Sequence, residues 1–214
     1  MCSSDLMPFK ALQIGSVFRA DRPQKGRYRQ FTQCDIDIIG DASEFAEIEL
    51  LLAAASVLSK ICPENKFFIR LNNREILKAM SEYAGFISDK LSDVFIILDK
   101  MDKIGLAGVQ KELIESGCDE KSTSKYTGLL HKLSESKDIS KNGDLLKKEL
   151  EGFINEEVVD SFIFTAEIVN NCKSLDFDIV FDPSLVRGMG YYTGTVFEIS
   201  MDGFSGSVAG GGRT

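Results

Sequence analysis

The stretch with the clearest potential for chemistry lies between Tyr28 and Ile39, where polar and apolar residues alternate. If this stretch is a strand, its two-residue period places the apolar Ile36 and Ile38 on one face. The other face carries a guanidinium, a ring, an amide and two carboxylates, from Arg29, Phe31, Gln33, Asp35 and Asp37. Burying such groups without partners is costly, so this face is unsuited to a core. We expect it to face a ligand.

Basic residues crowd together just before this strand and at its start, although the chain as a whole is acidic, with a net charge of -8. They are Arg19, Arg22, Lys25, Arg27 and Arg29. Planar guanidinium groups bind phosphate oxygens in pairs, so the cluster would suit the phosphates of a nucleotide. The alternative is a solvated, charged turn that binds nothing. The cluster alone does not decide between the two.

A second candidate site lies between Leu185 and Glu198, where Arg187 sits among glycines that let the backbone approach a ligand closely. Strand alternation gives one face to Tyr192, Gly194, Val196 and Glu198. Their phenol and carboxylate could then point into the same cavity as Gln33 and Asp37. The alternative is a pair of core tyrosines beside a tight turn.

The elements that must position these residues begin with an antiparallel hairpin, made of residues 14–20 and 28–39 around a turn-rich loop. Helical spacing of apolar residues and the possible caps Asp41 and Ser43 predict a helix next. The segments expected in this first part are that helix up to about Lys60, a strand over 66–71 and a helix from Arg74 to Gly85. This pattern predicts an α+β fold with an antiparallel sheet flanked by helices.

The middle of the chain differs from both ends. From residue 86 to residue 173 the periodicity is helical, and the polar stretches 122–124 and 140–143 are interpreted as linkers between helices. Strand-like residues return at 177–181 and 191–201. We therefore predict a helical insertion between two parts of one sheet domain.

Composition excludes several classes of protein. A net charge of -8 argues against a broad basic face for nucleic acid. The longest apolar stretch is far shorter than the roughly 20 residues of a membrane span, and nothing resembles a secretory signal, so we expect a cytoplasmic protein. The five cysteines are scattered and interpreted as reduced, mostly buried thiols. The only histidine, His131, is expected at the surface.

Three motifs together resemble one family. Residues 17–31, Val-Phe-Arg-Ala-Asp-Arg-Pro-Gln-Lys-Gly-Arg-Tyr-Arg-Gln-Phe, closely resemble the second class-defining motif of the histidyl-tRNA synthetases. Residues 185–198 resemble that family's histidine-binding signature, and residues 206–213 resemble its glycine-rich strand. The resemblance covers nearly everything from Met7 onward. It implies the catalytic core of a class II aminoacyl-tRNA synthetase, interrupted by a helical insertion.

The resemblance implies an ATP site on the hairpin. Arg19 corresponds to the residue that grips the α-phosphate, and Arg27 to the residue that reaches the outer phosphates. Asp21 corresponds to a residue that helps to hold adenine, and Phe31 to the ring that stacks on it. Mg²⁺ would accompany ATP, but no residue is identified as its ligand and no tightly bound cofactor is expected.

The resemblance also implies a histidine site. Gln33 corresponds to a contact with the amino acid, and Asp37 with Tyr192 to the pair that recognises imidazole; Tyr191 lies in the same signature. A carboxylate that accepts a ring N–H would select histidine. Arg187 corresponds to the arginine that stabilises the pentavalent phosphorus centre, and with Arg19 it is the expected catalytic residue. The physical reason is fixed positive charge where negative charge develops.

The activity implied is that of a histidine–tRNA ligase, which uses ATP to make histidyl-adenylate and transfers histidine to tRNA(His). The full-length protein is expected to be a homodimer without a membrane partner. The expected organisation is a non-family junction over 1–6, core over 7–85, insertion over 86–173 and truncated core over 174–214. Because the other family motifs lie outside this sequence, we expect an internal fragment with little or no activity alone. The alternatives are a histidine-sensing paralogue, similar to the regulatory subunit of ATP phosphoribosyltransferase, and a pseudo-synthetase domain that senses uncharged tRNA.

Overall fold

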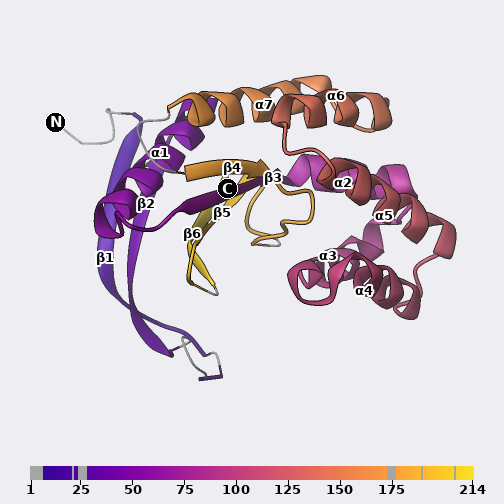
Figure 1. Ribbon diagram of the computed structural model, residues 1–214, viewed down its shortest axis with the longest axis horizontal. Helices are drawn as coiled ribbons and strands as arrows, with labels where there is room; N and C mark the ends of the chain where they lie inside the picture. The colour runs from indigo at the N-terminus through magenta and orange to yellow at the C-terminus, as the bar shows by residue number, and fades with distance from the viewer. Residues whose placement is uncertain (1–6, 21, 24–27, 173–176, 189, 205) are drawn as a thin grey trace. The chain divides into compact units, whose positions relative to one another are not determined.

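The computed structural model describes residues 7–20, 22–23, 28–172, 177–188, 190–204 and 206–214 (Figure 1). The chain divides into two compact units, Met1–Leu50 and Leu51–Thr214. Among the described residues, the first unit carries a sheet of two strands and the second a sheet of four.

The first unit is built around a long hairpin of β1 (Phe9–Phe18) and β2 (Gln30–Ile39). The two strands are antiparallel, with Val17 opposite Phe31 and Ala11 opposite Asp37. The predicted hairpin is confirmed, but β1 begins five residues before residue 14. Lys10, Ala11 and Gln13 are poor strand formers, so local propensity hides this part of the strand. Pairing along the whole of β2 outweighs that propensity.

Helix α1 (Glu44–Ile61) follows the hairpin, close to the predicted bounds. Before its first turn, the carboxylate of Asp41 accepts a hydrogen bond from the backbone N–H of Ser43 at 2.8 Å. Acidic residues in its first turn and Lys60 in its last turn suit the helix dipole. Within the first unit, Glu49 of α1 pairs with Lys10 of β1 at 2.6 Å.

The sheet of the second unit contains β3 (Phe67–Asn73), β4 (Phe177–Phe181), β5 (Thr195–Met201) and β6 (Ser207–Gly212), in the order β4-β3-β5-β6. The pairs β3–β5 and β5–β6 are antiparallel, as expected. The pair β3–β4 departs from that expectation because it is parallel. Parallel neighbours need a long crossover, and the helices between β3 and β4 supply it.

The two faces of this sheet differ sharply. Directly opposite residues on neighbouring strands point to the same side. The core face carries buried Phe67, Ile69 and Leu71 of β3 beside the buried Phe181 and Ile199. The opposite face, called the polar face below, carries Arg70 and Asn72 of β3, Glu198 of β5 and Gly210 of β6.

Helices occupy most of the chain between β3 and β4. They are α2 (Arg74–Ala84), the short 3₁₀ helix η2 (Ser88–Lys90), α3 (Leu91–Leu98), α4 (Met101–Glu115), α5 (Glu120–Ser134), α6 (Ile139–Glu149) and α7 (Glu156–Asn171). Figure 1 shows α6 and α7 side by side, and both contact β4. The rings of Phe162 in α7 and Phe181 in β4 meet edge to face, with their centroids 5.4 Å apart.

Helix α2 confirms its predicted bounds. Its cap Asn73 accepts a hydrogen bond from the N–H of Glu75 at 2.8 Å. Gly85 ends the helix with a φ of 98°, a left-handed conformation that glycine adopts without strain.

Some local predictions were wrong. Residues 122–124 and 140–143, expected to be linkers, lie inside α5 and α6. Asp119 and Asp138 cap these helices. Thr123 and Asn142 lie on the buried side of the helices, and Ser124, Ser140 and Lys141 lie on the exposed side. The strand expected from residue 191 starts only at Thr195.

Cysteine burial was also misjudged, because only Cys118 of the four described cysteines is buried; all four are free thiols. His131 is confirmed at the surface, with a side chain that is 63% exposed. Within the described part of the chain, no helix combines the length and apolar character that a membrane span requires.

Candidate functional site

The side chain of Arg187 is fixed on the polar face of the second unit. Its Nε donates a hydrogen bond to Oε2 of Glu198 on β5 at 2.9 Å. Its Nη2 donates to the hydroxyl of Ser207 on β6, also at 2.9 Å. The guanidinium is therefore held by two neighbouring strands, although it stays partly exposed. A cation held in this way is preorganised to meet an anion.

The glycine-rich strand β6 makes room for this guanidinium. A Cβ placed on Gly210 would lie 2.5 Å from Nη1 of Arg187 and 2.6 Å from its Cζ. A Cβ on Gly212 would lie 3.0 Å from the ring of Tyr192 and 2.5 Å from the backbone oxygen of Thr195. Any larger residue at these two positions would push Arg187 or Tyr192 away. The bare backbone at Gly210 and Gly212 thus leaves the space that Arg187 and Tyr192 occupy.

The loop that carries Arg187 is attached to β3. The N–H of Asp182 donates to the carbonyl of Leu71 at 2.9 Å. The side-chain amide of Asn72 donates to the carbonyl of Leu185 at 3.1 Å, and Asn72 is completely buried. Leu185 and Val186 are buried as well. These contacts fix the backbone on the N-terminal side of Arg187.

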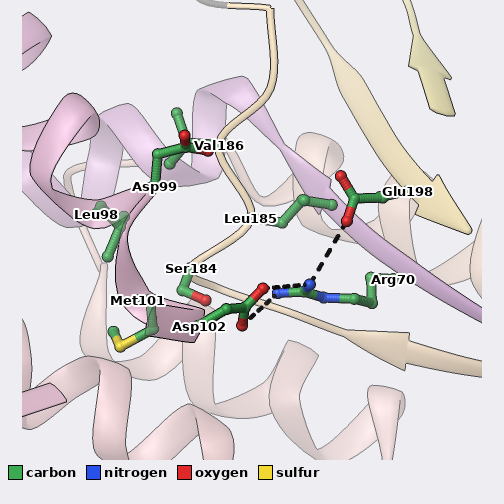
Figure 2. A pocket seen from close by; sticks show the side chains of 9 residues that line it. All are labelled: Arg70, Leu98, Asp99, Met101, Asp102, Ser184, Leu185, Val186 and Glu198. Atoms are coloured by element: carbon green, nitrogen blue, oxygen red, sulfur yellow. Dashed lines mark hydrogen bonds and ion pairs between the residues drawn. The ribbon is translucent and has the colours of Figure 1, made fainter. Parts of the chain in front are cut away.

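Arg70, also on β3, lies at the centre of a group of acidic residues (Figure 2). Its Nε donates to Asp182 at 2.6 Å, and its Nη1 and Nη2 donate to Asp102 of α4 at 2.7 and 3.2 Å. Its Nη1 also lies 3.7 Å from Oε1 of Glu198. Burial opposes the charge of the guanidinium, but Asp102 and Asp182 outweigh burial and raise the pKa of Arg70.

A small pocket lies beside this group, with a volume of about 40 Å³, enough for a few water molecules. It is lined by Arg70, Leu98, Asp99, Met101, Asp102, Ser184, Leu185, Val186 and Glu198. Sequence patterns missed Arg70, Asn72 and Asp182. The available signal was a charge and an amide inside the apolar strand Phe67–Asn73, because buried groups of this kind need partners.

The hairpin of the first unit carries the other group of predicted residues. The guanidinium of Arg19 lies over the ring of Phe31, 4.4 Å from its centroid. Its Nε donates to the carbonyl of Tyr28 at 3.0 Å, and its backbone N–H donates to the carbonyl of Arg29 at 2.9 Å. Arg19 is thus held at the end of the hairpin, against the ring of Phe31. Both residues are predicted to bind ATP.

Further along the same face of β2, the side-chain amide of Gln33 donates to the carboxylate of Asp35 at 2.7 Å. Gly15 lies directly opposite Gln33, and no described atom lies within 4 Å of a Cβ placed there. Asp37 is exposed. The predicted ligand face therefore has room above Gln33, and Asp37 can reach a ligand.

Not every predicted site residue can be placed. Asp21 and Arg27, predicted to bind ATP, lie outside the described residues. Tyr191 is 67% exposed, and its ring meets that of Tyr192 edge to face, with centroids 5.1 Å apart. Gln33 and Asp37 belong to the first compact unit and Tyr192 to the second, so their common cavity stays a prediction.

Comparison with known proteins shows which family these features belong to. Residues 7–213 match the family model described as histidyl-tRNA synthetase. The chain belongs to the histidyl-tRNA synthetase family. The motifs noted in the sequence therefore fall within a match that covers nearly the whole chain.

The relatives of this histidyl-tRNA synthetase family member include two similar proteins named histidine–tRNA ligase. The protein from Leifsonia xyli subsp. xyli is 39% identical over 213 residues, which are 98% of this chain and 49% of that protein. The protein from Flavobacterium johnsoniae is 41% identical over 217 residues, which cover 96% of this chain and 43% of that protein. The chain spans about half the length of the curated relatives that it matches.

One solved structure agrees with this family assignment, and another has a similar fold. The histidyl-tRNA synthetase from Nostoc sp. PCC 7120 has a TM-score of 0.81 and 27% identity, covering 97% of this chain and 48% of its own. An ATP phosphoribosyl transferase complex from Thermotoga maritima has a TM-score of 0.71 but only 13% identity, over 98% of this chain and 69% of its own. The second likeness shows a shared fold alone.

Proposed function

We propose that these residues belong to a histidine–tRNA ligase, which joins histidine to ATP as histidyl-adenylate, releases pyrophosphate and transfers histidine to tRNA(His). The names of relatives that are 39% and 41% identical support this proposal. The observation that carries it is Arg187, fixed by Glu198 and Ser207 over the bare backbone of Gly210. We expect the protein in the cytoplasm as a homodimer.

The chemistry proposed for Arg187 is charge stabilisation. When the histidine carboxylate attacks the α-phosphorus, negative charge grows on the phosphate oxygens, and a fixed cation lowers the energy of that state. Glu198 and Ser207 engage Nε and Nη2, and within the described part of the chain Nη1 makes no hydrogen bond. Nη1 is the donor that we assign to the phosphate. No side-chain nucleophile is needed, because the substrate carboxylate itself attacks.

The hairpin is proposed to bind ATP. Phe31 would stack on adenine, Arg19 would bind the α-phosphate, and Arg27 and Asp21 would contact the outer phosphates and adenine. The contact between Arg19 and Phe31 supports this arrangement, since one side chain orients the other. Mg²⁺ would arrive with ATP as part of the substrate. Among the described residues, no three His, Cys, Asp or Glu side chains are grouped to hold a metal ion.

Histidine is proposed to bind to Gln33 and Asp37 of the first unit and to Tyr191, Tyr192 and Arg187 of the second, as the resemblance implies. The exposed carboxylate of Asp37 and the open space over Gly15 support a ligand on this face of β2. A carboxylate that accepts the imidazole N–H rejects amino acids without that donor, because it would otherwise be left unpaired.

The test is exchange of labelled pyrophosphate into ATP by the full-length protein, with each of the twenty amino acids in turn. Exchange that depends on histidine alone supports the ligase. The second candidate is a histidine-sensing regulatory subunit, which the shared fold of the Thermotoga maritima complex brings into consideration. Histidine binding without exchange would favour that candidate. We expect residues 1–214 alone to show little or no aminoacylation.

A further inference from the structure

Arg70 joins three parts of the second unit that are far apart in sequence. It pairs with Asp182 at the start of the loop that carries Arg187, with Glu198 on β5, and with Asp102 in α4. Figure 2 shows the carboxylates of Asp102 and Glu198 on either side of its guanidinium. A single charged group therefore touches a helix, a strand and a loop.

The next link is Glu198, whose two carboxylate oxygens face two different arginines. Oε2 accepts the hydrogen bond from Nε of Arg187 at 2.9 Å, whereas Oε1 lies 3.7 Å from Nη1 of Arg70. The same Nη1 donates to Asp102 at 2.7 Å. Because Nη1 carries two N–H groups, Asp102 and Glu198 do not exclude each other, but the shorter contact with Asp102 holds the guanidinium away from Glu198.

We propose that Arg70 is a positioning residue through which helix α4 sets the orientation of Arg187. When Asp102 moves away, the guanidinium of Arg70 is free to move toward Glu198, the carboxylate turns toward Arg70, and Arg187 loses the bond that holds its Nε. The consequence for catalysis rests on the proposed function of Arg187, but the coupling itself does not.

The burial of these groups suits such a link. The side chains of Arg70, Asp182 and Glu198 are 22%, 15% and 22% exposed, so these three residues form the less accessible part of the ion-pair group. The side chain of Asp102 is 66% exposed, so it is the partner of Arg70 that is most open to solvent, and it moves with helix α4. A partner that binds the helices and moves α4 would therefore act on Arg187 without touching it.

The coupling can be tested by NMR on the chain labelled with ¹⁵N, using the Nε–Hε signal of Arg187, which an Arg187→Lys variant identifies. We expect Asp102→Asn to shift this signal by more than its linewidth and to speed exchange of its proton with water several-fold. Asp99→Asn is the matched control, because Asp99 lines the same pocket but lies outside the ion pairs of Arg70, and it should leave the signal in place. Arg70→Lys, which keeps the charge but loses the fork, should shift the signal as Asp102→Asn does.

The proposal is overturned if Asp102→Asn shifts the Nε–Hε signal of Arg70 but leaves that of Arg187 unchanged, since the ion pair would then be real and uncoupled. Because this readout does not depend on turnover, it is separate from the fate of the proposed function. Absence of histidine-dependent pyrophosphate exchange would refute the ligase activity and leave the coupling standing.

Discussion

The guanidinium of Arg187 lies against the backbone of Gly210, so closely that a Cβ on this glycine would be 2.5 Å from Nη1. Arg187 comes from the loop after β4, and Gly210 from the last strand of the sheet. The guanidinium of Arg187 therefore packs against the glycine-rich strand, and its hydrogen bond to Glu198 fixes its position there.

Replacing Gly210 with alanine should displace Arg187 while leaving the rest of the sheet intact. A displacement of about 1 Å at a catalytic group lowers turnover by on the order of 100-fold, and we expect a loss of that size in histidine-dependent pyrophosphate exchange. The matched control is Gly128→Ala in α5, where no described atom lies within 4 Å of the added Cβ. Equal activity of the two variants would show that the close approach does not matter.

Phe31→Leu should weaken the use of ATP, because the ring is proposed to stack on adenine and also supports Arg19. Loss of one base–aromatic contact costs about 1–3 kcal/mol, so we expect the KM for ATP to rise by roughly 10-fold or more. Tyr28→Leu removes another ring of the hairpin, one that is 66% exposed, and should change this KM little. A similar rise in both variants would argue against a specific stack on Phe31.

Asn72→Leu should destabilise the second unit. The substitution leaves the carbonyl of Leu185 buried without its donor, which costs about 1–3 kcal/mol of the free energy of unfolding. Urea denaturation provides the measurement. Asn65→Leu is the comparison, because Asn65 makes the same kind of bond, to the carbonyl of Asp202, but at an exposed position. If the two substitutions cost the same, the buried amide has no special role in holding the loop.

Glu149, in the helices, makes the free energy of unfolding depend on pH. Its hydrogen bond with Lys132, at 2.9 Å, lowers the pKa of Glu149 in the folded chain. The stability from this group is therefore fully present above the unfolded pKa of about 4.3, and it is lost as pH falls through the lower folded pKa. We expect Glu149→Gln and Lys132→Met each to remove this part of the acid sensitivity of the unfolding free energy. If the unfolding free energy of both variants falls with pH as steeply as that of the wild type, Glu149 is not the group responsible.

Local patterns were enough to predict the hairpin, helix α2 and the strand nature of β3. Alternation over 28–39 and the glycine that ends α2 at Gly85 are signals contained in a few consecutive residues. The strand β1 was predicted too short because its first residues are ordered by pairing with β2, which local propensity does not reveal.

The candidate site was only partly accessible from the sequence. Arg187, Tyr192 and the glycines of β6 could be singled out by residue type and by resemblance. That Gly210 and Gly212 make room for Arg187 and Tyr192 is visible only in the fold. Arg70, Asn72 and Asp102 were missed because their partners lie 112, 113 and 32 positions away along the chain. A charge inside an apolar strand indicates that a partner exists, but it does not identify which residue the partner is.

Arg187 is proposed to supply fixed positive charge during the formation of histidyl-adenylate. This role is tested most directly by measuring histidine-dependent pyrophosphate exchange in the full-length protein with Arg187→Ala. Removing one group that stabilises charge in this way lowers kcat by about 100- to 1,000-fold, and we predict such a loss with the KM for ATP changed only a few-fold. An unchanged kcat, or a defect seen only as higher KM values, would contradict this role of Arg187.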